Sequence, residues 1–183
     1  MEFLKLFQPA CIRGVDPAAS SIDAARRRLL SEHDTNAVSF EVGNIYDIEN
    51  MDRDCEQPSL AVVRGVLHHL DNPRAAIARL AEQFDSVLIL EPNGFNPAMK
   101  AIEKLSTYHR NHDEKSYWPP ALNRWFSECG FSVVEQKFFC LVPYFCPTPI
   151  AKCLKALEPF VEMIPVVREI GCGTNLILYK RTS

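Results

Sequence analysis

The chain has 183 residues, 47% of them hydrophobic and 23% charged, and a formal net charge of −3. This composition is typical of one soluble globular domain, 1–183, with a core of its own. The slight acidity argues against the basic face that nucleic-acid binders usually carry, so no nucleic-acid partner is expected. No apolar run approaches the roughly 20 residues of a transmembrane helix, and Pro9 interrupts the amino-terminal segment too early for a signal peptide.

The cysteines predict neither a disulfide framework nor a metal site. There are seven of them, an odd number, and they lie scattered along the chain without a CxxC pair or a zinc-like His/Cys spacing. They are residues 11, 55, 129, 140, 146, 153 and 172. We expect reduced thiols in a cytoplasmic protein and no bound metal.

In the first third of the chain, apolar periodicity alternates between strand and helix, which predicts an α/β fold with a mostly parallel sheet. Residues 3–7 read as the end of a helix, and 11–15 as a short strand. A helix through IDAARRRLL follows, with Ser20 or Ser21 as its N-cap. Residues 38–42 alternate as the next strand.

The middle of the chain continues this rhythm. LAVVRGVL, residues 60–67, is a continuous apolar run of the kind that is buried on both faces of a sheet. Asp71, Asn72 and Pro73 begin a helix through AAIARLAEQF, because proline is tolerated in a first helical turn. SVLIL, residues 86–90, is the clearest strand in the chain.

The last part of the chain is less regular. Residues 97–118 combine a short helical stretch with a polar loop, and we interpret them as a variable acceptor or lid segment. PPALNRWFSECG predicts a helix that ends at Gly130, and FSVVEQKFF and TNLILYKR predict two strands. Between these strands, residues 141–165 form an amphipathic insertion with a bend expected at Pro159.

One face of this insertion carries a stripe of apolar residues at helical spacing. The stripe consists of Ile150, Cys153, Leu154, Leu157 and Val161. Such a stripe suits a membrane surface, a partner helix or the domain's own core, and we favour the core.

The residues that follow the strands are the candidates for chemistry, because an open α/β sheet binds its ligand at the carboxyl ends of its strands. They are Asp16, Asn44, Arg64, Gly65 and Glu91. A carboxylate at the position of Asp16 suits both hydroxyls of a ribose. A turn-forming Asp-Pro pair, Asp16 and Pro17, explains the same residues without a ligand.

Four segments, in order, resemble class I S-adenosylmethionine-dependent methyltransferases of the small-molecule type. They are IRGVDPAASSIDAARRRL, VSFEVGNIYDI, LAVVRGVLHHLDNPRAAI and SVLILEPNG, and SYWPPALNRWFSECGFSVVEQ resembles a later helix and strand of the same family. The resemblance covers roughly residues 3–140. It implies a Rossmann-like fold, S-adenosylmethionine as cofactor, Asp16 and Pro17 at the ribose, and Asn44 and Ile45 at the adenine.

The family's first strand and glycine-rich loop do not precede residue 3, so the resemblance implies a chain that enters the fold after that motif. Without that strand, residues 11–15 and 60–64 are expected to lack a partner strand between them. A circular permutation is the alternative: VVREIGCGTN, with Gly171 and Gly173, then supplies the strand and loop, and 176–181 becomes helical. An ordinary tight turn before a last strand explains the same glycines, and we favour it.

Methyl transfer depends mainly on holding a nucleophile in line, and a histidine near neutral pKa suits removal of its proton. His68 and His69 are the candidate bases, with packing at a helix start as the alternative, and His109 and His112 are further candidates. Tyr108, Tyr117 and Trp118 line an acceptor pocket or form the lid's own core, and Glu91 binds an acceptor or merely solvates a strand end.

The resemblance leaves two classes of function open. The first is methyl transfer to a small-molecule, sugar or lipid-linked acceptor, with peripheral membrane contact through the amphipathic segment. The second is a catalytically incompetent fold remnant or binding module. A Rossmann dehydrogenase ranks third, because it needs a GxGxxG of its own. The sequence does not indicate an oligomeric state.

Overall fold

A computed structural model describes residues 11–30, 38–48, 59–105, 115–142 and 146–182. The chain divides into two compact units, residues 1–50 and 51–183. The expected helix at 3–7, the tail of the lid segment at 106–114, and with them Tyr108, His109 and His112, lie outside the described residues.

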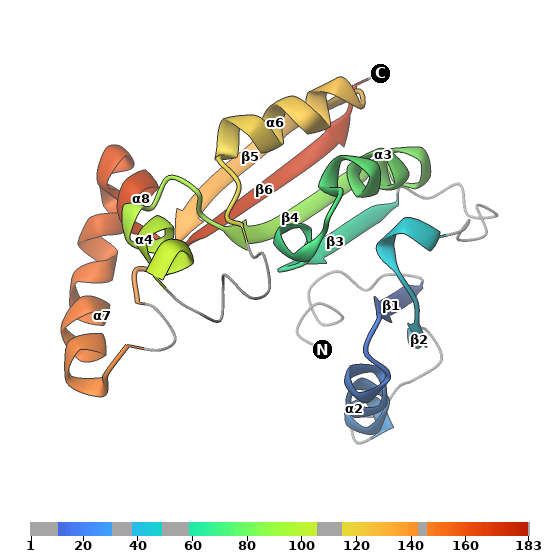
Figure 1. Ribbon diagram of the computed structural model, residues 1–183, viewed down its shortest axis with the longest axis horizontal. Coiled ribbons are helices and arrows are strands. Elements are labelled where there is room, and N and C mark those ends of the chain that lie inside the picture. Colours follow the sequence, from blue (N-terminus) through green and yellow to red (C-terminus); the bar gives the residue numbers. More distant parts are fainter. Residues whose placement is uncertain (1–10, 31–37, 49–58, 106–114, 143–145, 183) are drawn as a thin grey trace. The chain divides into compact units, whose positions relative to one another are not determined.

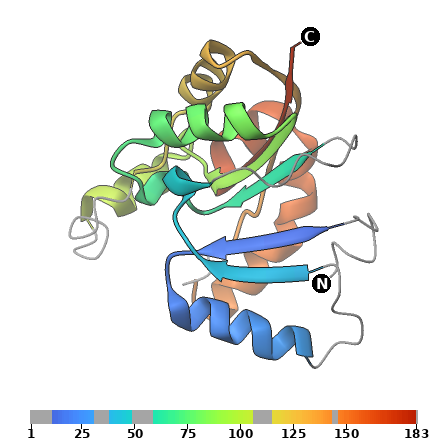
Figure 2. The same cartoon turned by 90° about the vertical axis from the view of Figure 1, so that its right-hand side faces the viewer.

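The first unit contains a parallel pair of strands, β1 (Ile12–Asp16) and β2 (Val38–Val42), joined through helix α2 (Ala19–Leu30). Helix α2 lies along the pair (Figure 2) and buries Ile22 and Leu29. Gly14 is needed here, because an added Cβ would lie only 2.5 Å from the ring of Phe40.

Helix α2 begins earlier than predicted. Ser20 and Ser21 lie inside it and are not its N-cap. The turn before the helix is closed instead by the Asp16 carboxylate, whose Oδ1 accepts a hydrogen bond from the backbone N–H of Ala18 at 2.8 Å.

The second unit is built on a four-stranded sheet in the order β3-β4-β6-β5, that is Leu60–Arg64, Ser86–Pro92, Thr174–Arg181 and Phe131–Phe139. Strands β3 and β4 are parallel, and β6 is antiparallel to both of its neighbours. Among the described residues β1 pairs only with β2 and β3 only with β4, so one edge of each lacks a partner strand, as the sequence predicts.

Helices α3 (Pro73–Gln83) and α6 (Pro119–Glu128) cover one face of this sheet (Figure 1). Asn72 caps α3 by accepting the N–H of Ala75, and Pro73 occupies its first turn as predicted. The rings of Phe126 and Tyr179 stack at 3.8 Å between α6 and β6, and both side chains are fully buried. Gly130 ends the α6 turn with φ +81°.

The expectation that residues 60–67 are buried on both faces is wrong. Strand β3 ends at Arg64, and the positive φ of Gly65 turns the chain into the 3-10 helix η2 (Leu67–His69). Ala61 and Val63 point toward the helices and are buried, whereas Leu60 and Val62 are 41% and 48% exposed. Only one face of β3 is therefore covered.

Beyond β4 the chain forms α4 (Pro97–Leu105), and between β5 and β6 it forms α7 (Thr148–Met163) and α8 (Pro165–Gly171). Helix α7 continues past Pro159 to Met163. Its apolar stripe does not dock on the core as predicted, because Ile150 and Leu157 are more than half exposed, while Leu154 and Val161 are half-buried.

The permuted arrangement is excluded by this part of the fold. Residues 165–171 are helical, and Thr174–Arg181 form a strand that is antiparallel to β4 and β5. Gly171 ends α8 and packs near Val161, so it does not belong to a phosphate-type loop after a parallel strand.

None of the described helices combines the length and apolar character needed to cross a bilayer.

Candidate functional site

The acidic residue predicted for a ribose lies at the carboxyl end of β1. One oxygen of the half-buried Asp16 carboxylate closes the turn to Ala18, and its other oxygen has no partner among the described residues. Pro17 follows, exposed, and fixes the backbone of that turn. A rigidly held carboxylate with one free oxygen at a strand end is suited to accept hydrogen bonds from ligand hydroxyls.

The end of β2 forms a second turn in the same unit. Asn44 uses its side-chain oxygen to accept the N–H of Tyr46 at 3.2 Å, and so caps the 3-10 helix η1 (Ile45–Asp47). The amide nitrogen of Asn44 has no partner within the described part of the chain, and Asn44 is exposed. Asn44 therefore offers a donor to a ring nitrogen, beside the half-buried Ile45.

In the second unit, the turn after β3 is anchored on one buried carboxylate. Glu91, at the end of β4, is 1% exposed. Its Oε1 accepts the backbone N–H groups of Val66 and Leu67 at 3.0 and 2.9 Å, and its Oε2 lies 2.7 Å from Nδ1 of His68. The Gly65 N–H also donates to the Leu90 carbonyl at 2.8 Å. Glu91 thus neither solvates a strand end nor stands free for an acceptor.

This contact determines which nitrogen of His68 is available. An ionised carboxylate only accepts, so Nδ1 carries the proton and Nε2 is left as the basic nitrogen. The His68 side chain is 12% exposed, and its ring centroid lies 3.9 Å from that of the exposed His69. A carboxylate behind a histidine, fixing its tautomer and orientation, is the arrangement of a general base.

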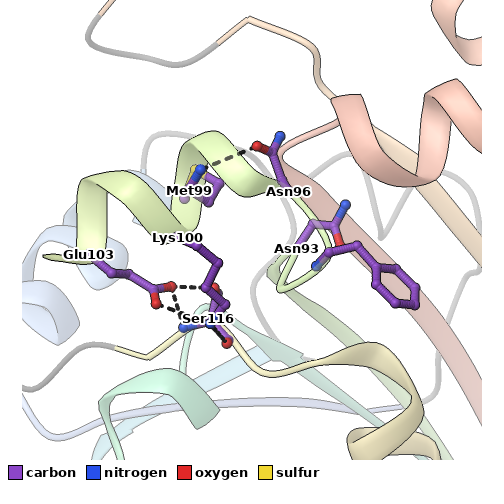
Figure 3. A network of polar contacts seen from close by, with 7 residues as sticks. Asn93, Asn96, Met99, Lys100, Glu103 and Ser116 are labelled. Carbon is purple, nitrogen blue, oxygen red and sulfur yellow. Dashed lines mark hydrogen bonds and ion pairs between the residues drawn. The ribbon is translucent and has the colours of Figure 1, made fainter.

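A further polar network holds the chain segment beside His68 (Figure 3). Glu103 of α4 accepts hydrogen bonds from the backbone N–H and the hydroxyl of the buried Ser116. Lys100 binds both Glu103 and the Ser116 carbonyl. The next residue back, Lys115, donates its backbone N–H to the His68 carbonyl at 3.4 Å. Helix α4 therefore fixes the segment that adjoins the candidate base.

Two asparagines tie the turn after β4 to α8. The side-chain nitrogen of Asn93 donates to the carbonyls of Glu169 and Cys172, and that of Asn96 donates to the carbonyls of Gly171 and Cys172. The Asn96 oxygen also caps α4 through Ala98 and Met99, a contact that Figure 3 shows in part. Because every polar atom of these side chains is satisfied, their role is structural.

Aromatic side chains flank the same segment. Tyr117 packs edge-on against Trp125 of α6, with centroids 5.1 Å apart. Trp118 packs edge-on against Phe95 at 5.9 Å and is 57% exposed. Tyr117 thus belongs to the packing against α6, whereas Trp118 presents an open aromatic face suited to an apolar acceptor.

The structure groups the predicted site residues by unit. Asp16, Pro17, Asn44 and Ile45 lie on the two strand ends of residues 1–50, and His68 lies with Glu91 in residues 51–183. Arg64 is exposed at the end of β3, and Gly65 provides the turn with φ +62°. Sequence reasoning missed the pairing of His68 with Glu91, the clamp of Glu103 on Ser116, and the two asparagines. Among the described residues no cluster of three or more His, Cys, Asp or Glu side chains is suited to a metal ion.

No protein-family model matches the chain, and no curated protein matches its sequence. Solved structures match its fold. Magnesium protoporphyrin IX methyltransferase from Synechocystis PCC 6803, solved with bound S-adenosylhomocysteine, matches at TM-score 0.66 and 11% identity, over 96% of this chain and 66% of that one. A Haloferax volcanii methyltransferase, solved with the Trm112 methyltransferase activator, matches at TM-score 0.69 and 16% identity, over 100% of this chain and 76% of that one.

An O-methyltransferase from neocarzinostatin biosynthesis, solved with S-adenosylhomocysteine and 1,4-dihydroxy-2-naphthoic acid, matches at TM-score 0.61 and 15% identity. The match covers 99% of this chain but 45% of that protein. The chain thus spans only part of the length of the proteins that it matches. At these identities the similarity establishes the fold, and the fold is that of class I S-adenosylmethionine-dependent methyltransferases, as the ordered sequence segments imply.

Proposed function

We propose that this protein takes part in S-adenosylmethionine-dependent methyl transfer to a small-molecule, sugar or lipid-linked acceptor. The observation that carries the proposal is the fully buried Glu91 carboxylate, which holds His68 with its Nε2 as the free basic nitrogen. A strand-end turn alone needs no histidine oriented in this way. The methyltransferase fold and the solved cofactor complexes of proteins that share it support the same function.

S-adenosylmethionine supplies an activated methyl group on its sulfonium. In the first unit Asp16 accepts hydrogen bonds from the ribose hydroxyls through the carboxylate oxygen that has no partner among the described residues, and the Asn44 amide donates to the adenine ring. The geometry of both turns fits these roles, because neither needs its remaining polar atom for the fold.

In the second unit His68 receives the proton of the acceptor's hydroxyl or amine at Nε2. Glu91 stabilises the imidazolium that results, because an opposite charge lies 2.7 Å from Nδ1. Trp118 presents an aromatic surface to the acceptor. General-base assistance of this kind typically contributes a factor of about 10² to 10⁴ in rate.

Isothermal titration with S-adenosylmethionine tests the cofactor role of Asp16. The Asp16→Asn variant keeps an oxygen for the turn to Ala18 but removes the charge that the ribose hydroxyls meet. Hydrogen bonds to a charged group contribute about 1.5–3 kcal/mol and neutral ones about 0.5–1.5 kcal/mol, so affinity is expected to fall about 10-fold or more. Asp23→Asn, at an exposed acid of α2, is the matched control and is expected to leave affinity unchanged.

Two results contradict the proposal. Equal affinities of the Asp16→Asn variant and the control show that Asp16 does not hold the ribose. No heat at high micromolar S-adenosylmethionine with the folded wild-type chain rejects cofactor binding and favours the alternative of a non-catalytic binding module.

A further inference from the structure

Helix α7 carries an exposed apolar face that the fold does not use. Between Ile150 and Ile170, eight large apolar side chains are 43–78% exposed. They are Ile150, Leu157, Phe160, Met163, Ile164, Val166, Val167 and Ile170. Monomeric soluble proteins rarely expose so much apolar surface in one region, and such patches usually mark a contact with another surface.

The half of α7 that faces its own unit is clearly distinct. Glu158 is buried, where it accepts the backbone N–H of Leu141 at 3.0 Å and pairs with Lys155. Leu154 and Val161, half-buried, lie on the same side at helical spacing, and Val161 approaches Gly171 of α8. The apolar residues at 150, 157 and 160 therefore occupy the opposite side of the helix.

Charge on this segment is sorted in the same way. The acids of α7 and α8 are Glu158, Glu162 and Glu169, and none of them is exposed. The exposed charged side chains of the two helices are both lysines, Lys152 and Lys155. The outer surface of α7 thus combines aliphatic and aromatic side chains with positive charge and no exposed negative charge.

We propose that α7 lies on an anionic lipid surface, with its apolar face in the boundary between headgroups and acyl chains. An interfacial helix has this composition: Phe, Leu and Ile on one side and lysines beside them. Each lysine near an anionic surface adds an attraction that a neutral surface does not provide. A second copy of the chain is less favoured, because two such faces would bring the lysines of both helices together without exposed acids to match them.

This surface narrows the acceptor named above, a step that rests on the proposed function. An enzyme that lies on a lipid surface meets a lipid-linked acceptor where it is embedded, so a lipid-linked acceptor is the class that fits. Binding to lipid itself requires no methyl transfer, so it is tested separately.

Co-sedimentation with vesicles tests the surface directly. Vesicles of phosphatidylcholine with about one third phosphatidylglycerol are the anionic probe, and pure phosphatidylcholine vesicles are the neutral one. The full chain is expected to bind the anionic vesicles, more weakly at high salt, and to bind the neutral ones less.

The variants separate the apolar and the electrostatic parts. Phe160→Gln replaces a side chain that is 67% exposed, so the fold is kept, and vesicle affinity is expected to fall about tenfold or more. Lys152→Glu is expected to weaken binding to anionic vesicles only. Val134→Gln, 56% exposed on β5, is the matched control and is expected to bind like the wild type.

Absence of wild-type binding to anionic vesicles overturns the proposal, as does equal loss in Phe160→Gln and Val134→Gln. A dimer in size-exclusion chromatography with light scattering that Phe160→Gln dissociates also overturns it, and assigns the face to a second copy of this chain. Vesicle binding without S-adenosylmethionine binding refutes the proposed function and leaves the lipid contact in place.

Discussion

Replacing Glu91 by glutamine is the change that most directly probes the buried turn around His68. Glutamine keeps the shape of glutamate but removes its charge and turns one oxygen into an amide nitrogen. In the native protein the carboxylate accepts three hydrogen bonds of 2.7–3.0 Å, from the N–H groups of Val66 and Leu67 and from Nδ1 of His68. The first two are still possible after the change, but each becomes neutral.

The expected loss follows from these three contacts. A hydrogen bond to a charged group contributes about 1.5–3 kcal/mol and a neutral one about 0.5–1.5 kcal/mol, so each bond weakens by roughly 1 kcal/mol. The free energy of unfolding of the second unit is thus expected to fall by about 3 kcal/mol, a large share of the roughly 5–15 kcal/mol of a typical domain. With a urea m-value of about 1–3 kcal/mol/M, the unfolding midpoint is expected to drop by about 1–3 M.

Tryptophan fluorescence during urea unfolding measures this loss in the correct unit. The chain has two tryptophans, Trp118 and Trp125, and both lie in residues 51–183. Glu128→Gln is the control, because it removes the same charge from an exposed ion pair with Arg74 whose side chains are 54% and 51% exposed. Such pairs contribute about 0–1 kcal/mol. A midpoint of Glu91→Gln equal to that of the control would refute the anchoring role of Glu91.

The remaining predictions concern two glycines and one thiol. Gly94→Ala is expected to lower the thermal midpoint strongly, because its Cβ would lie 2.2 Å from the Tyr117 carbonyl oxygen, whereas Gly130→Ala, with φ +81° and open space around it, is expected to lose only about 1 kcal/mol from backbone strain; equal losses by calorimetry would contradict the close packing at Gly94. Burial raises the pKa of the Cys172 thiol to about 11, so at pH 8 it is expected to resist a thiol reagent that labels the exposed Cys153, as mass spectrometry would show. Equal labelling rates of the two thiols in the native protein would show that Cys172 is not buried.

Much of the fold was predictable from local signals. The strand at 86–90 alternates in burial along its length, and Pro73 with Asn72 marks the start of α3 where the sequence places it. Both signals act within a few residues, so a single sequence reveals them. The same holds for Gly130, whose positive φ closes α6.

The failures arise where distant residues decide. Ser20 and Ser21 are good N-cap residues, but the Asp16 carboxylate closes the turn first, so the helix starts at Ala19. The run at 60–67 is apolar throughout, yet burial depends on which neighbours cover each face, and helices cover only the side of Ala61 and Val63.

The candidate site shows the same limit more sharply. The sequence indicated His68 and Glu91 separately, each as the residue after a strand, and gave both an equally good structural explanation. The contact that distinguishes these explanations joins residues 23 apart and depends on the parallel pairing of β3 with β4. Parallel pairing brings the carboxyl ends of both strands to one edge, so a histidine after one strand and a carboxylate at the end of the next become neighbours.

The pairing also explains why the carboxylate is buried rather than solvated. A buried charge is stable only when its hydrogen bonds are satisfied, and the sharp turn at Gly65 aims two backbone N–H groups at Glu91 before the imidazole reaches it. The backbone therefore stabilises the carboxylate independently of His68. It follows that a change of His68 removes the base and leaves the turn folded, whereas a change of Glu91 affects both, so the two variants separate chemistry from stability at this site.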